Sequence, residues 1–167
     1  MLWVHFKVSQ AMFDAICEMR NLETLWIKWS GIKSIESIAK LEQLQDLHIG
    51  SSTQIESIKP LVHLRTLKWL YLENIKKIRD ISPLGECPQL LGLGVEGSMW
   101  TTQKIESLHP LSRLTELRFL SLANLRSADT SLKPLHGLHK LERLCVPAWW
   151  PAAEMEELKR INPRLEI

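Results

Sequence analysis

Apolar residues fall at every third position through much of this chain, and this spacing limits how the chain can fold. One such run extends from Ile55 to Leu70, and equivalent runs begin at Ile32 and Ile105. An α-helix turns about 100° per residue, so a spacing of three drifts around the helix instead of forming one stripe. A half-buried strand needs a spacing of two. The period of three therefore predicts tight 3₁₀ turns and extended coil in these runs.

The same short pattern recurs along the chain at a nearly constant interval. A Leu-x-x-Leu-x-(Leu, Ile or Val) unit occurs six times, and the steps between the first leucines are 22, 23, 23, 27 and 24 residues. Only the fourth unit is enlarged, around residues 96–104. Each unit is expected to be a short strand, a bend and a tight return segment. Stacked units would bury one continuous core beside a parallel sheet.

Length and composition narrow the class of protein. The chain has 167 residues, so we expect a single domain over residues 1–167 with six to seven repeats. A net charge of +2 is too small to indicate nucleic-acid binding. No apolar run is long enough to span a membrane. The three cysteines are far apart and fit neither a disulfide framework nor a metal site. We expect a cytoplasmic protein, or a secreted one if a signal has been removed.

The repeat pattern is similar to that of a known superfamily. The Leu-x-x-Leu-x-Leu units and the Ile-x-x-(Ile or Leu)-x-Pro-Leu-x-x-Leu-x-x-Leu return segments resemble leucine-rich repeats, in particular the short bacterial repeats of the internalin kind. The resemblance covers about residues 2–147. It implies an α/β solenoid, a right-handed arc with a parallel sheet on the concave side and a convex side of mostly 3₁₀ turns and coil. The family's asparagine ladder is expected to be incomplete, because Ser30, Ser52 and Ser98 stand at its positions.

The two ends of the chain predict different structures. Helices are expected at about residues 10–20, with Ser9 as the N-cap, and at about 151–161, where the helix would cap the solenoid. Residues 2–6 read as a first strand without a cap, and such an edge tends to pair with another chain. This predicts either a piece of a longer repeat array or self-association through residues 2–6. Four tryptophans in bends or at the start of the last helix are expected to pack: Trp29, Trp100, Trp149 and Trp150.

No arrangement of residues indicates catalysis. Cys145 could act as a nucleophile beside His48 or His139, but His139 falls on the return side and His48 lies four repeats away. An inert strand cysteine is therefore favoured. The segment 92–97, Gly-Leu-Gly-Val-Glu-Gly, falls on a strand and lacks both the spacing and the following helix of a phosphate loop. We expect no enzymatic activity, no metal and no cofactor.

Residues that alternate with the strand leucines face the inner surface of the predicted arc. In the first four units this row is rich in aromatic side chains. Gly92 and Gly94 follow and are expected to leave a hollow beside the aromatic wall. Glu73 and Glu96 border it, which favours a basic group on a partner. The predicted partner-binding residues are Trp3, Trp26, Asp46, His48, Trp69, Tyr71, Glu73, Gly92, Gly94 and Glu96.

Three functions fit this surface. Large aromatic side chains on an exposed face are typical anchors of protein interfaces, so the leading hypothesis is a non-catalytic protein–protein interaction module. One alternative is a structural repeat fragment that self-associates through its first strand. Another is carbohydrate binding, because tryptophan and tyrosine platforms also stack on sugars. The aromatic rings could also pack on one another as a rigid platform without a ligand.

Overall fold

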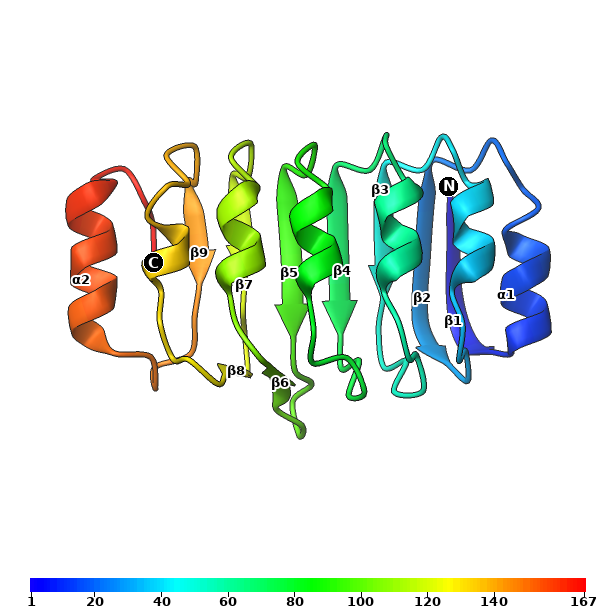
Figure 1. The fold of residues 1–167 in the computed structure, drawn as a ribbon. Helices are drawn as coiled ribbons and strands as arrows, with labels where there is room; N and C mark the ends of the chain where they lie inside the picture. Colours follow the sequence, from blue (N-terminus) through cyan, green and yellow to red (C-terminus); the bar gives the residue numbers. More distant parts are fainter.

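Seven short strands form one parallel sheet in the computed structural model, which describes residues 1–167 (Figure 1). The strand order is β1-β2-β3-β4-β5-β7-β9, and a second sheet pairs β6 with β8. The strands of the large sheet are Leu2–Val8 (β1), Thr24–Ser30 (β2), Asp46–Ile49 (β3), Trp69–Glu73 (β4), Gly92–Glu96 (β5), Phe119–Ser121 (β7) and Arg143–Cys145 (β9). The small sheet consists of Gln103–Ile105 (β6) and Leu125–Ser127 (β8).

The repeat pattern sets the register of the sheet. Leu25 pairs with Leu47, Leu47 with Leu70, and Leu70 with Leu93. Equivalent positions of successive repeats are therefore direct neighbours across the sheet. Side chains that alternate with these leucines form parallel rows on the opposite surface, which we call the concave face.

The return segments explain the period of three. Five 3₁₀ helices cover one side of the sheet: Glu36–Lys40 (η1), Lys59–His63 (η2), Ser82–Glu86 (η3), His109–Arg113 (η4) and Lys133–Leu135 (η5) (Figure 1). Around η2, Leu61 donates its backbone N–H to Ile58, Leu64 to Leu61 and Leu67 to Leu64, at N···O distances of 3.1, 3.1 and 3.2 Å. Every third residue thus closes a 3₁₀ turn and points inward. The leucine-rich solenoid with a parallel sheet and a mostly 3₁₀ return side is confirmed.

A single hydrophobic core runs between the sheet and the return segments. It contains 45 buried residues and extends from Val4 to Leu165 without a break. The inward-pointing leucines and isoleucines of each return segment pack against the strand leucines of the same and neighbouring repeats. No repeat buries its apolar face alone, so the stack is stable only as a unit.

The two α-helices lie at opposite ends of the stack (Figure 1). Helix α1 is Gln10–Ile16, shorter than the expected 10–20, and Ser9 caps it by accepting the Met12 N–H at 3.3 Å. It ends early because Glu18 and Met19 donate to carbonyls three residues back, which returns the chain to 3₁₀ turns. Helix α2 is Ala152–Ile161, close to the expected capping helix. Neither helix is long and apolar enough to cross a membrane.

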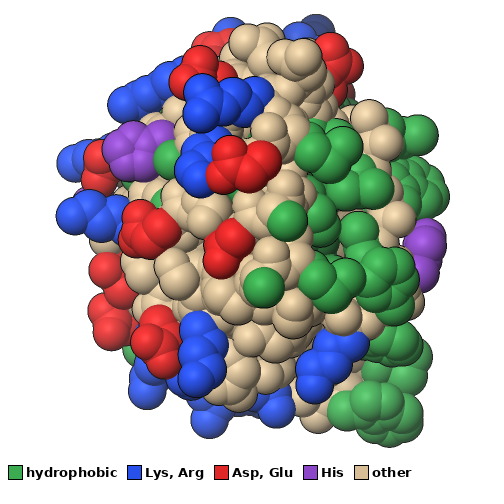
Figure 2. Space-filling view, turned by 90° about the vertical axis from the view of Figure 1, so that its right-hand side faces the viewer, with side chains coloured by type: hydrophobic (Ala, Val, Ile, Leu, Met, Phe, Trp, Pro, Cys, Tyr) green, Lys and Arg blue, Asp and Glu red, His purple; other side chains and the backbone are tan.

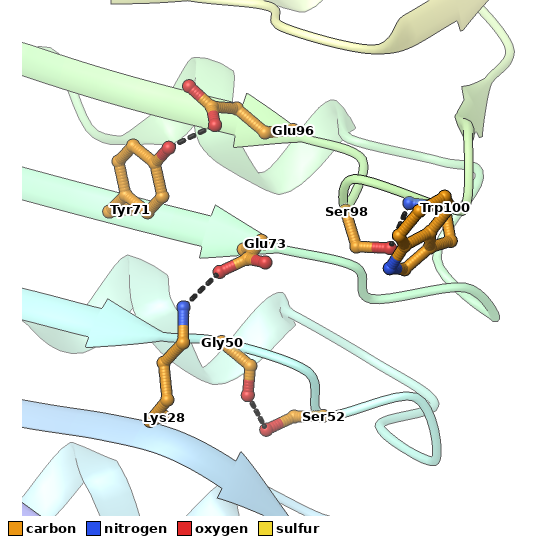
Figure 3. Close-up of polar contacts among 8 residues, drawn as sticks. All are labelled: Lys28, Gly50, Ser52, Tyr71, Glu73, Glu96, Ser98 and Trp100. Atoms are coloured by element: carbon orange, nitrogen blue, oxygen red, sulfur yellow. Dashed lines mark hydrogen bonds and ion pairs between the residues drawn. The ribbon is translucent and has the colours of Figure 1, made fainter. Parts of the chain in front are cut away.

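The four tryptophans with a predicted packing role differ in burial, and one of them, Trp29, lies within β2 and not in a bend. Trp150 is buried, as expected, and Trp149 is half-exposed beside Arg126, whose guanidinium carbon lies 5.1 Å from the ring centroid. Trp29 and Trp100 are exposed, Trp100 by 88%, so for these two the prediction is wrong. Trp100 lies at the tip of the enlarged fourth unit, which extends beyond the strand ends, and its backbone N–H is 3.3 Å from the Ser98 hydroxyl (Figure 3).

Strand β1 forms one edge of the sheet. Its pairing with β2 shifts register between Val4 and Lys7, so the apolar alternation breaks and Phe6 is 59% exposed instead of entering the core. Figure 2 views the molecule from this end, and hydrophobic side chains gather along one side of it, while most charged side chains lie on the other. The exposed hydrophobic residues of this part of the chain are Met1, Trp3, Phe6, Met12, Met19 and Trp29.

Candidate functional site

Four rings from four adjacent strands follow one another in a row on the concave face. Trp3 and Trp26 are parallel stacked, with ring centroids 4.8 Å apart and planes 13° apart. His48 follows at 4.8 Å from Trp26, and Tyr71 at 4.6 Å from His48. The sheet register places these residues directly opposite one another, so the stacking follows from the repeat alignment. We call Trp3, Trp26, His48 and Tyr71 the aromatic ladder.

A second pair of rings lies beside the ladder. Trp69 contacts Phe119 with ring centroids 5.4 Å apart, although the strand that carries Gly92 separates them in the sheet. The rings can meet because Gly92 has no side chain. A Cβ on Gly92 would lie 2.1 Å from the Trp69 ring.

The two glycines therefore provide the space in which the neighbouring aromatic rings lie. A Cβ on Gly94 would lie 2.3 Å from the ring of Tyr71, in the same way that Trp69 covers Gly92. Both glycines are buried. A missing side chain on one strand lets the ring of the preceding strand lean over it, and both glycines still line a groove beside the aromatic side chains.

The two predicted border carboxylates are already engaged within the protein (Figure 3). Glu73 forms an ion pair with Lys28 at 3.1 Å. The two side chains come from β2 and β4 and meet above Gly50, which follows the intervening strand β3. A Cβ on Gly50 would lie 3.2 Å from a Glu73 carboxylate oxygen. Glu96 accepts hydrogen bonds from the hydroxyls of Tyr71 and Ser121. These contacts fix the edge of the concave face, and they leave neither carboxylate free in the way the sequence suggested.

Burial shifts the ionisation of three groups on this face. It raises the pKa of the Asp46 carboxyl, and the nearby indole of Trp26 offsets this only in part and makes no well-formed hydrogen bond to it. Burial lowers the pKa of His48, with Lys28 adding to the effect and Glu73 opposing it, so the imidazole is neutral at pH 7. Burial and then the hydrogen bond to Glu96 raise the pKa of Tyr71, which remains a hydrogen-bond donor.

A groove of about 620 Å³ lies over strands β2 to β9 on the concave face. Most of the predicted residues line it, whereas Trp3 and Glu96 lie outside its lining. Sequence reasoning did not select several residues of the lining: Lys28, Phe119, Ser121, Arg143 and Cys145. The sequence could have indicated Phe119, because Trp69, Gly92 and Phe119 occupy the same position of three successive repeats. A small residue between two large ones allows the two rings to meet.

The site offers shape and stacking surface. No cluster of three or more His, Cys, Asp or Glu side chains is placed to hold a metal ion. All three cysteines are free thiols; Cys17 and Cys87 are buried and Cys145 is exposed. Burial raises the pKa of Cys17 to about 12 and that of Cys87 to about 11, which makes both thiols poor nucleophiles at neutral pH.

Comparison with known proteins agrees with this architecture. The chain matches no model of a known protein family. A stretch of 88 residues is 30% identical to human leucine-rich repeat-containing protein 56 and covers 52% of this chain and 16% of that protein. Among solved structures, an internalin from Listeria monocytogenes is similar with a TM-score of 0.70 at 22% identity. Internalin C2 of the same species is similar with a TM-score of 0.68 at 25% identity.

The chain has the leucine-rich repeat fold of the internalins. The two matches cover 80% and 82% of this chain, and the resemblance predicted from the Leu-x-x-Leu-x-Leu units is confirmed. The chain spans 37% and 55% of the two internalins, less than two thirds of either. The likeness thus concerns the repeat region. The groove described above lies on the sheet surface of that region.

Proposed function

We propose that this leucine-rich repeat chain is a non-catalytic module that binds a protein partner on its concave face. The observation that carries the proposal is the exposure of large aromatic side chains around the groove. Trp3 is 50% exposed and Trp69 is 43% exposed, and each contacts a second ring that holds it in place. Aromatic anchors that are already ordered lose little entropy on binding, and such residues dominate interface energies.

The Trp69 side chain provides the sharpest test of this proposal. Trp69→Ala removes an exposed ring and leaves the buried leucines of β4 intact. Affinity capture from cells of the source organism, with the full chain as bait, identifies the partner, and calorimetry measures its affinity. Trp69→Ala is expected to weaken binding about 30-fold, since truncating an interface anchor commonly costs about 2 kcal/mol or more.

Trp100→Ala is the matched control. It removes an equally large and more exposed tryptophan that lies on the enlarged fourth unit, outside the groove lining. A partner that binds the Trp100→Ala variant normally and the Trp69→Ala variant weakly supports the concave face. Equal binding by the parent and Trp69→Ala, with unchanged melting temperatures, contradicts the proposal. Trp26 is less suitable for this test, because it is stacked between Trp3 and His48 and its loss would also disturb the ladder.

Carbohydrate binding makes a different prediction for the same variants. Sugars stack on exposed indole faces, so a glycan array probed with the parent and with Trp69→Ala would detect specific glycans lost only in the variant. Such a result would replace the protein partner by a glycan. If no glycan binds specifically, the concave face remains the proposed site for a protein partner.

The edge of β1 favours self-association as a second candidate function. Strand β1 has seven residues, pairs with β2 on one side only, and carries the exposed Trp3 and Phe6. An apolar strand with unpaired backbone groups is a template for a strand of another copy. The proposed contact is a dimer through residues 2–6.

Phe6→Lys tests this second candidate without disturbing the core. Phe6 is exposed, so lysine there adds a charge to the edge and leaves Val4 and Val8 buried. Light scattering at high protein concentration is expected to show a dimer for the parent and a monomer for Phe6→Lys. A parent that stays monomeric, or a dimer that Phe6→Lys leaves unchanged, contradicts the edge contact.

A further inference from the structure

The charged groups of the groove are paired with one exception. Lys28 pairs with Glu73 at 3.1 Å, and Arg143, also in the lining, pairs with Glu166 at 3.0 Å. Asp46 also lines the groove and forms no ion pair. Its polar neighbour is the Trp26 indole, which lowers the pKa of Asp46 in part but does not reach well-formed hydrogen-bond geometry. It is half-buried among neighbours that do not neutralise it. The groove therefore contains one carboxylate without a cationic partner.

Aromatic surface lies on both sides of this carboxylate. Asp46 pairs in register with Thr24 of β2 and with Trp69 of β4, and Trp26 is the next residue of that face along β2. The Trp69 ring leans over Gly92, away from Asp46, so it does not cover the carboxylate. Trp69 and Asp46, direct neighbours across the sheet, both line the groove. The indole N–H of Trp26 is buried and makes no well-formed hydrogen bond, with the Asp46 carboxylate as the acceptor near it.

We propose that this part of the groove receives a cationic side chain of the partner, an arginine in preference to a lysine, which pairs with Asp46 and stacks on Trp69. The inference rests on the proposed function of the concave face and names the chemistry of its ligand. A cation over a tryptophan face is attracted by the ring electrons, and the attraction grows as water is excluded. A guanidinium is planar, so it can stack on the indole while donating to a carboxylate; a lysine ammonium can only act as a point charge.

The observations favour an organic cation over a metal ion. A metal site needs several ligand atoms, and no cluster of three or more suitable side chains exists in this chain. The groove has the volume of a site that takes a side chain or short segment, about 620 Å³. Burial also raises the pKa of Asp46, which means that the folded protein holds this negative charge at a cost that a bound cation relieves.

Capped tripeptides, acetyl-Gly-X-Gly-amide, serve as probes in a titration of the full chain followed by the NMR signals of the Trp26 and Trp69 indole N–H groups. X is arginine, lysine, citrulline or leucine, and citrulline is the uncharged equivalent of arginine. The arginine peptide is expected to give saturable shifts, with weaker binding by lysine. The affinities of the citrulline and leucine peptides are expected to be lower by a factor of about ten or more. A hydrogen bond to a charged group contributes about 1.5 kcal/mol or more, which corresponds to about a tenfold change in affinity.

Asp46→Asn is the decisive variant. It keeps the shape of the side chain and removes the charge, so binding of the arginine peptide should fall about tenfold while the melting temperature at neutral pH does not decrease. Glu36→Gln is its matched control, because Glu36 is exposed on η1, on the return side. Binding of citrulline as tight as that of arginine, an unaffected Asp46→Asn variant, or no saturable shifts at all would overturn the inference.

The experiment separates this inference from the proposed function. A captured protein partner that is lost with Trp69→Ala but retained in full by Asp46→Asn leaves the concave face as the binding site and overturns the cationic ligand. A partner that is retained by Trp69→Ala contradicts the proposed function itself.

Discussion

Replacement of Leu67 by alanine is expected to lower the free energy of unfolding by about 2–5 kcal/mol, as for other fully buried leucines. Leu67 lies in the middle of the stack, is 0% exposed, and belongs to the every-third-residue line of its repeat. Its backbone hydrogen bond to Leu64 survives the change, so the loss measures side-chain packing alone. The cavity cannot close easily, because the neighbouring repeats hold the surrounding leucines in place.

Chemical denaturation measures this effect, with Arg65→Ala as the control. Arg65 is two residues away and exposed, and its replacement should change the free energy of unfolding by less than about 0.5 kcal/mol. A loss below about 1 kcal/mol for Leu67→Ala would mean that the core is loosely packed, contrary to the continuous buried cluster.

Gly97→Ala is expected to destabilise the protein by about 1–3 kcal/mol, because the added methyl group meets backbone atoms that cannot move independently. Its Cβ would lie 2.3 Å from the Thr101 carbonyl oxygen and 2.4 Å from that of Asn124. These carbonyls belong to the enlarged fourth unit and to the bend of the next repeat. To admit the methyl group, the two segments must separate.

The matched control is Gly137→Ala, where a Cβ would have nothing within 4 Å. This variant should be as stable as the parent or slightly more stable, since alanine reduces the freedom of the unfolded chain. Thermal and chemical unfolding of the two alanine variants, measured side by side, tests the comparison. Equal stability of the two would show that the fourth unit adjusts freely around Gly97.

Much of the fold could be predicted because the backbone geometry of each repeat determines the spacing of its buried residues. The i to i−3 hydrogen bonds that join Ile58, Leu61 and Leu64 produce the period of three that the sequence displays. The same regularity predicts register, so the contact of Trp26 with His48 on the next strand follows from equivalent positions. Positions outside the period carry no such information. Trp29 lies near the end of β2, beyond the register shift, and Trp100 lies in a turn of the enlarged fourth unit, so spacing does not distinguish buried from exposed side chains at either position.

The candidate site was harder to predict than the row of residues that forms it. The sequence places Trp69 and Gly92 side by side, but it does not say in which direction the ring leans. That direction depends on side-chain torsion angles and on Phe119 one strand further on. Similarly, Glu73 is neutralised because the long side chain of Lys28 reaches past Gly50, a contact between alternate strands that no local pattern reveals.

The nearest-neighbour register of the sheet also bears on how such a protein can evolve. Each strand pairs only with those beside it, and β5 still pairs with β7 although the enlarged fourth unit intervenes in sequence. Duplication of one repeat would therefore keep every existing pairing except the one it enters. It would lengthen the concave face by about 4.8 Å, the spacing of neighbouring strands. Genetic gain or loss of whole repeats thus changes the length of the ligand that the face can span, while point changes on the face, such as Asp46→Asn, alter its chemistry.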